Sequence, residues 1–239
     1  MTELLYMKDI DSNYIKEFDA TVTKNKKNYI TFDKTAFYPK GGGQPSDTGI
    51  INWDDKTSKV KEVIKKGSTI KHIIEGEKPE VGTKIHAKIN WDKRYSHMKM
   101  HTAQHILSGI IFDDHHARTV GNQIHADYSR VDFKPITFSE EDLKKIEKKF
   151  NEIVSKNSPI TIYEENRENL EKRVNTERAN LDLLPKFIKK LRIVEIKDFD
   201  ICPCAGTHVK NTSEIPKIDK IKRETKGKDT DRIIYSLKK

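Results

Sequence analysis

Apolar and polar residues alternate over much of the first 90 residues, which is the pattern of half-buried β-strands. Phe18, Ala20 and Val22 alternate with polar neighbours, and a polar turn is expected at Lys24–Lys27. Many short strands separated by turns predict a small β-barrel or a β-sandwich here. The further strands expected in this region are Tyr29–Phe32, Val60–Ile64, Thr69–Ile74 and Thr83–Ile89.

The period of the pattern changes after about residue 90. A helix is predicted over residues 92–112, because apolar side chains recur there at helical spacing and Asp92 is a suitable N-cap. A second helix is predicted over residues 140–156, where Ser139 and Asp142 fit a capping pattern. Strands are expected near residues 128–133, 160–164, 191–197, 217–223 and 231–237, and residues 165–182 are expected to form a polar surface helix or excursion.

These elements predict an α+β chain with two domains. Residues 1–90 are expected to form a β-barrel-like domain, and residues 91–239 an α+β domain with an antiparallel sheet. A length of 239 residues accommodates two small domains, and the apolar share of 34% is low but sufficient for their cores.

The charge balance favours a polyanionic partner. Lysine and arginine number 46 against 37 acidic residues, a net charge of +9, which suits nucleic acid but is also typical of a lysine-rich, soluble protein. Cys202 and Cys204 are too close in sequence to form a disulfide framework, so a reducing compartment is expected. Apolar runs of membrane-spanning length and a signal-peptide pattern are both missing, so we expect a cytoplasmic protein without a membrane partner.

Two spaced pairs of metal-capable side chains are the main chemical signal. His101 and His105 lie four residues apart on the predicted helix and therefore on one face of it. Cys204 and His208 frame a short glycine-containing loop that can direct both side chains inward. One cysteine and three histidines form a donor set suited to tetrahedral zinc, either in a hydrolytic site or in a closed structural one. Because Thr102 stands where zinc peptidases carry glutamate, peptide hydrolysis by that route is not expected.

The segment Phe37–Gly49, FYPKGGGQPSDTG, carries three successive glycines. Such a run lets the backbone approach a ligand and present N–H groups to a phosphate or carbonyl oxygen. The segment lacks the endings of a P-loop and of a dinucleotide-binding fingerprint. A wide loop between two strands explains it equally well.

The motifs together resemble the AlaX family of free-standing alanyl-tRNA editing proteins and the editing domain of alanyl-tRNA synthetase. The resemblance extends over most of the chain, and the glycine loop makes it similar to the medium-length form. The matching stretches are FYPKGGGQPSDTG at 37–49, INWDKRYSHMKMHTAQHILSG at 89–109, RVDF at 130–133, CPCAGTHVKNTSEI at 202–215 and DRIIY at 231–235.

The resemblance implies a zinc-containing editing domain that hydrolyses mischarged tRNA(Ala). The expected reaction removes serine, and in some members glycine, from the 3′ end of tRNA(Ala) and spares Ala-tRNA(Ala). It implies one Zn²⁺ ion, which either activates a water or positions the substrate. The implied ligands, also taken as the catalytic residues, are His101, His105, Cys204 and His208.

Further site residues are expected around these ligands. Substrate contacts are expected from Thr102, Gln104, Gly41, Gly42, Gly43 and Gln44, with Thr119 as the reader of the serine hydroxyl; tRNA phosphate contacts are expected from Arg94, Lys99 and Arg130. Ala205 replaces a glycine that the family often carries, which is tolerable unless that position needs a positive φ. Cys202 is interpreted as a buried hydrophobe, with an alternative ligand or a redox-sensitive thiol left open. His97 is expected to be an outer-shell or neutral residue, and His115, His116 and His125 to be incidental.

Three other functions remain open. The chain could be a non-catalytic tRNA-binding module with a structural zinc, an editing enzyme for another tRNA such as that of threonine, or a general zinc esterase. The basic charge and the ordered motifs argue against the last. The preference between serine and glycine and the oligomeric state are not determined by these patterns.

Overall fold

In the computed structural model, residues 2–239 are described, and they divide into one unit that ends at His97 and another from Met98 to Lys239. The division falls within a long helix, α1 (Trp91–His115). The predicted α+β class and the predicted barrel are both confirmed, whereas the domain boundary at residue 90 stays a prediction.

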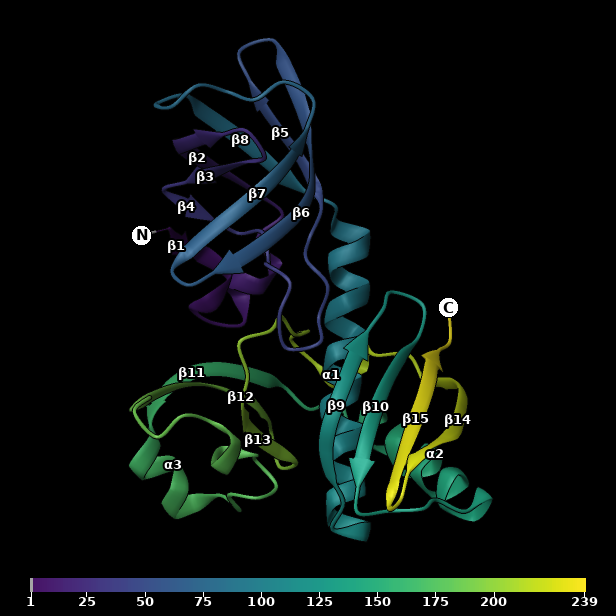
Figure 1. Ribbon diagram of the computed structural model, residues 1–239. Coiled ribbons are helices and arrows are strands. Elements are labelled where there is room, and N and C mark those ends of the chain that lie inside the picture. Colours follow the sequence, from purple (N-terminus) through teal and green to yellow (C-terminus); the bar gives the residue numbers. More distant parts are fainter. Residues whose placement is uncertain (1) are drawn as a thin grey trace. The chain divides into compact units, whose positions relative to one another are not determined.

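The first unit is built around a closed barrel of six strands, drawn in purple and blue in Figure 1. Alternating residues of these strands fill its interior, among them Phe18, Ala20 and Val22, as the sequence pattern predicts. Neighbouring strands pair antiparallel throughout. In barrel order the strands are β2 (Glu17–Lys26), β3 (Tyr29–Phe32), β7 (Thr69–Glu75), β6 (Lys56–Lys66), β5 (Gly49–Trp53) and β8 (Lys84–Ile89).

Short elements flank the first barrel strands in the sequence. β1 (Glu3–Leu4) pairs parallel with β4 (Lys34–Thr35), and the 3-10 turns η1 (Leu5–Met7) and η2 (Asp11–Tyr14) connect β1 to β2. Two details differ from expectation: β2 continues to Lys26, so the turn begins only at Lys27, and β5 was not predicted. Polar residues at the end of a hairpin extend beyond the core and therefore imitate a turn in the sequence.

Asn90, and not Asp92, caps helix α1. The Asn90 side chain accepts a hydrogen bond from the Lys93 N–H at 3.3 Å, whereas Asp92 already lies inside the first turn. The prediction of Asp92 as the cap was therefore wrong by two residues. An acidic residue in the first turn still interacts favourably with the positive end of the helix dipole.

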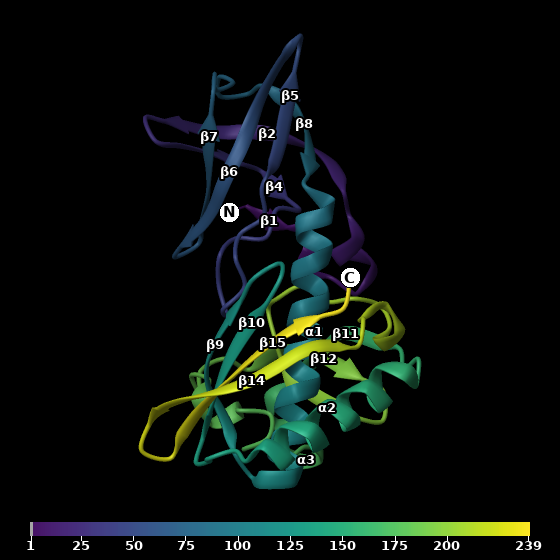
Figure 2. The ribbon, with the colours of Figure 1, turned by 90° about the vertical axis from the view of Figure 1, so that its right-hand side faces the viewer.

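The second unit contains two antiparallel sheets. One has four strands in the order β14 (Ile218–Gly227), β15 (Thr230–Leu237), β10 (Ser129–Lys134) and β9 (Arg118–Ile124), as Figure 1 shows. Helix α2 (Glu140–Ser155) lies beside β14 in Figure 2, and Asn151 accepts a hydrogen bond from the Ile218 N–H. The predicted capping box is confirmed: Ser139 and Asp142 exchange side chain–backbone bonds.

The second sheet of this unit leads into the loop that carries Cys204 and His208. Its strands are ordered β11 (Ile160–Asn166), β12 (Lys190–Ile196) and β13 (Asp200–Pro203), and Cys204 directly follows β13. The predicted polar excursion contains α3 (Arg167–Arg173) and η3 (Leu181–Leu183), and η4 (Thr212–Glu214) follows the loop with His208. β9 and β13 were not predicted, because β9 contains glycine and polar residues and β13 is only four residues long.

Candidate metal centre

The four predicted ligands come together in space. His101 and His105 on α1 and Cys204 and His208 after β13 place one donor atom each within 4.8 Å of all the others. Cys204 Sγ lies 3.6 Å from His101 Nε2 and 3.4 Å from His208 Nε2. When a nitrogen atom and a sulfur atom bind the same tetrahedral zinc ion, they lie about 3.5 Å apart. The donor set and its spacing therefore fit a zinc ion.

Burial prepares these residues to bind a cation. The three imidazoles are almost fully buried, and Cys204 is half-buried. Burial lowers the pKa of His105 to about 4 and that of His208 well below its usual value, so both rings are neutral ligands at pH 7. Burial also raises the pKa of the Cys204 thiol, which a 3.3 Å hydrogen bond from the Gly206 N–H opposes. Metal binding should therefore release a proton from Cys204.

Thr102 fixes the orientation of His208. Its hydroxyl donates to the Met98 carbonyl at 2.8 Å and also lies 3.1 Å from His208 Nδ1. Because a hydroxyl has one proton, Nδ1 must be the donor in the second contact, which leaves the Nε2 lone pair directed at Cys204. Thr102 is fully buried and contacts His208, so it supports one of the predicted ligands. The direct substrate contact expected from Thr102 stays a prediction.

Cys202 contacts His105, whereas the sequence interpretation treated it as a buried hydrophobe. Its Sγ lies 3.2 Å from His105 Nδ1, and Asp200 Oδ2 lies 3.8 Å from the same nitrogen. Sequence reasoning missed Asp200 in this role. The signal was present in the spacing, because Asp200, Cys202 and Cys204 alternate and therefore share one side of an extended strand.

A row of polar groups lies beside the ligands on α1. Gln104 accepts a hydrogen bond from Asn122 of β9 at 2.6 Å, and Ser108 lies 2.9 Å from Thr119 of the same strand. Gln104 and Ser108 are four residues apart, as are His101 and His105, so the two rows run side by side along the helix. Asn122 and Ser108 were not predicted as site residues. Thr119 remains a prediction as the reader of a substrate hydroxyl.

Arg94 is not a phosphate contact. Its side chain is 0% exposed and its guanidinium bonds both carboxylate oxygens of Asp47 and the carbonyls of Asn13 and Ala36. Its partners all lie in the first unit and its side chain is fully buried, so a tRNA phosphate cannot reach it. Lys99 and Arg130 are half-buried, and Arg130 donates to Gln123 at 2.8 Å; their role toward tRNA stays a prediction.

The glycine loop is a tight turn within the first unit. Gly41 and Gln44 exchange backbone hydrogen bonds, and Gly42 and Gly43 take positive φ values of 55° and 80°. The Tyr38 hydroxyl donates to the Gly41 carbonyl at 2.9 Å. Gln44 is buried, while Gly41 and Gly42 are exposed. The predicted approach of this loop to substrate stays a prediction.

The remaining histidines lie outside the four-residue cluster. His125 stacks on Tyr128 at 4.4 Å, and His115 and His116 pack edge-on against phenylalanines. His97 is buried one helical turn before His101. Ala205 does not take a positive φ, so the exchange of glycine for alanine at this position creates no backbone strain.

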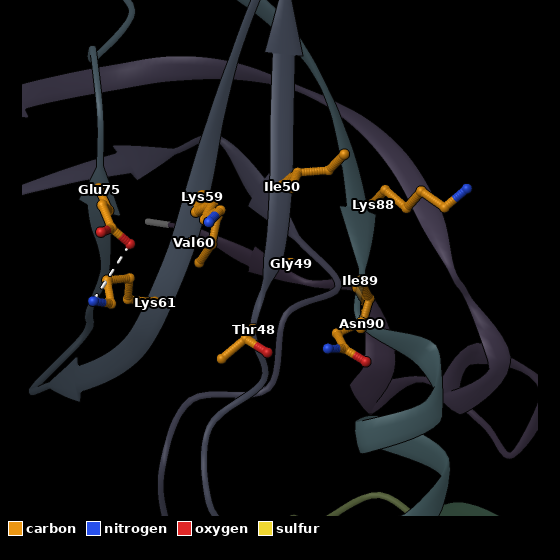
Figure 3. Close-up of a pocket in the computed structure, with 10 residues that line it drawn as sticks. All are labelled: Thr48, Gly49, Ile50, Lys59, Val60, Lys61, Glu75, Lys88, Ile89 and Asn90. Carbon is orange, nitrogen blue, oxygen red and sulfur yellow. Dashed lines mark ion pairs between the residues drawn. The ribbon is translucent and has the colours of Figure 1, made fainter.

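The first unit has a surface pocket of about 490 Å³ between β5, β6 and β8, shown in Figure 3. Its lining contains Lys59, Lys61 and Lys88, and Lys61 pairs with Glu75 at 3.4 Å. The lining contains three lysines and one glutamate, and it has no imidazole or thiol group.

Comparison with known proteins identifies relatives of the whole chain. Residues 5–93 match the family described as tRNA synthetases class II (A), and residues 191–234 match the threonyl and alanyl tRNA synthetase second additional domain. The chain is 39% identical to the alanyl-tRNA editing protein AlaX-M of Methanosarcina barkeri, over 99% of each chain. It is 36% identical to the AlaX-M protein of Saccharolobus solfataricus, over 100% of each chain.

The alanine–tRNA ligase of Thermococcus kodakarensis is 35% identical over 98% of this chain, which corresponds to 26% of the ligase. The chain therefore corresponds to one segment of that enzyme and to the whole of the AlaX-M proteins. It belongs to the AlaX-M family of alanyl-tRNA editing proteins. Over residues 2–239, every helix is too short or too polar to cross a membrane.

Proposed function

We propose that this protein is a zinc-dependent trans-editing esterase for tRNA(Ala). It hydrolyses the aminoacyl ester of Ser-tRNA(Ala), takes Gly-tRNA(Ala) as a second substrate, and spares Ala-tRNA(Ala). The observation that carries the proposal is the cluster of His101, His105, Cys204 and His208 in a chain that belongs to the AlaX-M family along its full length. The proposed site of action is the cytoplasm.

The need for such an enzyme follows from the limits of binding. A pocket built for alanine cannot strongly exclude serine, which adds only a hydroxyl, so a second site is needed to remove the error. A site that hydrogen-bonds the serine hydroxyl discriminates in the opposite sense, because alanine leaves its polar groups without a partner. Gln104, Asn122, Ser108 and Thr119 supply polar groups of this kind beside the ligands.

The metal and the residues around it have separate roles in the proposed reaction. Zinc, when bound, would supply a Lewis acid that activates a water or orients the substrate amino group. Thr102 holds His208 in the tautomer that offers Nε2, and the buried position of His105 keeps its ring neutral. Lys99 and Arg130 are the proposed contacts to the phosphates of the acceptor end.

The test compares deacylation of four substrates by one preparation: Ser-tRNA(Ala), Gly-tRNA(Ala), Ala-tRNA(Ala) and Ser-tRNA(Thr). The proposal expects rapid loss of serine from tRNA(Ala), with alanine retained, and no such loss with His101→Ala. Faster hydrolysis of Ser-tRNA(Thr) would assign the protein to threonine editing instead. If all four esters survive while tRNA binds, the protein is a binding module and the proposal is wrong.

A further inference from the structure

Strand β13 and the residue that follows it place three chemically active side chains on one side. Asp200, Cys202 and Cys204 alternate along the chain, and β13 pairs with β12 through Asp200↔Ile196 and Cys202↔Val194. The Cys204 N–H continues this pairing with a bond to the Arg192 carbonyl at 3.1 Å. Cys204 belongs to the proposed metal centre, whereas Asp200 and Cys202 are not among its four ligands.

Cys202 and Asp200 both lie near Nδ1 of the His105 ring. Cys202 Sγ lies 3.2 Å from His105 Nδ1, and the donor atoms of His105, Asp200 and Cys202 all lie within 4.8 Å of one another. An imidazole that binds a metal through one nitrogen carries a proton on the other. Since Nδ1 is engaged by Cys202, Nε2 is the atom left for the metal.

Arg178 links Asp200 to helix α1. Arg178 bonds the Asp200 carboxylate and also bonds Asp113 Oδ1 at 2.9 Å. Asp113 follows His105 by two helical turns, with Gly109 between them on the same face. A Cβ at Gly109 would lie 2.7 Å from Arg178 Nη2 and 2.9 Å from the Phe199 ring, so glycine is needed for this approach.

We propose that Cys202 is a positioning residue that orients His105 for metal binding. Its sulfur accepts a hydrogen bond from His105 Nδ1–H, and its own thiol hydrogen is directed to Asp200, which Arg178 anchors to Asp113. The contacts form a closed path that starts and ends on α1. This inference rests on the proposed metal centre, whose four ligands it leaves unchanged.

A second metal ion at His105, Asp200 and Cys202 is the main alternative. The geometry favours the hydrogen-bonded arrangement, because Asp200 already bonds Arg178 and His105 has one nitrogen left for each side. The alternative predicts two bound ions for each chain, whereas the positioning role predicts one.

The test is Co²⁺ binding to the metal-free full chain, followed by its absorption spectrum. Cys202→Ala should bind one Co²⁺ with about 10- to 100-fold weaker affinity, the range measured when outer-shell partners are removed. The sulfur-to-cobalt charge-transfer band of Cys204 should be retained. Cys202→Ser, which keeps a donor and an acceptor, should recover most of the affinity. Ile201→Ala is the matched control, since Ile201 packs against the same apolar cluster as Cys202 but has no hydrogen-bonding group in its side chain.

Each other outcome identifies what fails. Unchanged affinity in Cys202→Ala, or no recovery in Cys202→Ser, overturns the positioning role. Loss of charge-transfer intensity in Cys202→Ala makes Cys202 a ligand, and loss of one of two bound ions makes it part of a second site. If His101→Ala binds Co²⁺ as tightly as the unaltered protein, the metal centre itself is wrong.

Discussion

Thr102 and His208, which are 106 residues apart in the sequence, are joined by a 3.1 Å hydrogen bond between Oγ1 and Nδ1. The Thr102 hydroxyl donates its single proton to the Met98 carbonyl, so His208 Nδ1–H is the donor in its bond with Thr102. This contact links the helix that carries two ligands to the loop that carries the other two. It leaves Nε2 of His208 facing Cys204 and the proposed metal position.

Replacing Thr102 with valine should therefore weaken metal binding. Valine has nearly the same shape but leaves His208 Nδ1 without its acceptor, and we expect about 10- to 100-fold lower zinc affinity. Competition against a chromogenic chelator measures the change. Thr102→Ser keeps the hydroxyl and should remain within a few-fold of the unaltered protein. Equal affinity for the valine variant would show that the contact does not orient the ligand.

Thr119→Val should reduce discrimination between serine and alanine. If the Thr119 hydroxyl reads the substrate hydroxyl, its loss should lower the ratio of Ser-tRNA(Ala) to Ala-tRNA(Ala) hydrolysis by about 2- to 12-fold, the value of one neutral hydrogen bond. Thr119→Ser is the matched control, because it retains the hydroxyl that lies near Ser108. An unaltered ratio would remove Thr119 from the list of substrate contacts.

Arg94→Ala should destabilise the protein and should not act through tRNA binding. The substitution leaves Asp47 buried and unpaired, which typically costs about 3–5 kcal/mol of unfolding free energy. Denaturant unfolding of Arg94→Ala and Asp47→Asn measures this. A variant that unfolds normally but binds tRNA weakly would restore Arg94 as a phosphate contact.

His72 should make the barrel less stable in acid. Burial lowers its pKa to about 3, from 6.5 in the unfolded chain, so only the unfolded state takes up a proton between these values. The contribution of His72 to the free energy of unfolding is therefore fully present above pH 6.5. It decreases as the pH falls to about 3, by up to about 1.4 kcal/mol per pH unit. His72→Gln should flatten this dependence.

His86→Gln is the control for that experiment. His86 is exposed, and a hydrogen bond with Asp19 raises its pKa, so its contribution to stability is present at low pH and is lost as pH rises. Replacing His86 should therefore leave the fall in unfolding free energy at low pH as steep as before. A fall that is equally steep in His72→Gln would mean that other groups determine it.

The sequence predicted those parts of the molecule in which local pattern and tertiary structure agree. Strands with strict alternation, such as β8, and the apolar stripe of α1 were placed closely, because burial on one face imposes those periods. β9 was missed because its residues are mostly half-buried and polar, and Val120 is an exposed bulge residue.

In the candidate site, too, features with a local pattern were predicted, and features that depend on tertiary contacts were not. The ligands could be found from local spacing, since an i, i+4 pair on a helix and a short loop each present two donors together. Their supporting partners depend on contacts across about a hundred residues, as between Cys202 and His105. Arg94 was misassigned because the sequence does not distinguish a buried, paired arginine from an exposed one.

The most direct test is to titrate zinc into chelator-treated protein while following hydrolysis of Ser-tRNA(Ala). We predict no hydrolysis without metal, a linear rise that ends at one equivalent of zinc, and no recovery at any zinc concentration in His101→Ala. Full hydrolysis by the metal-free protein, or none by the folded, zinc-loaded protein, would contradict the account of this cluster as the hydrolytic centre.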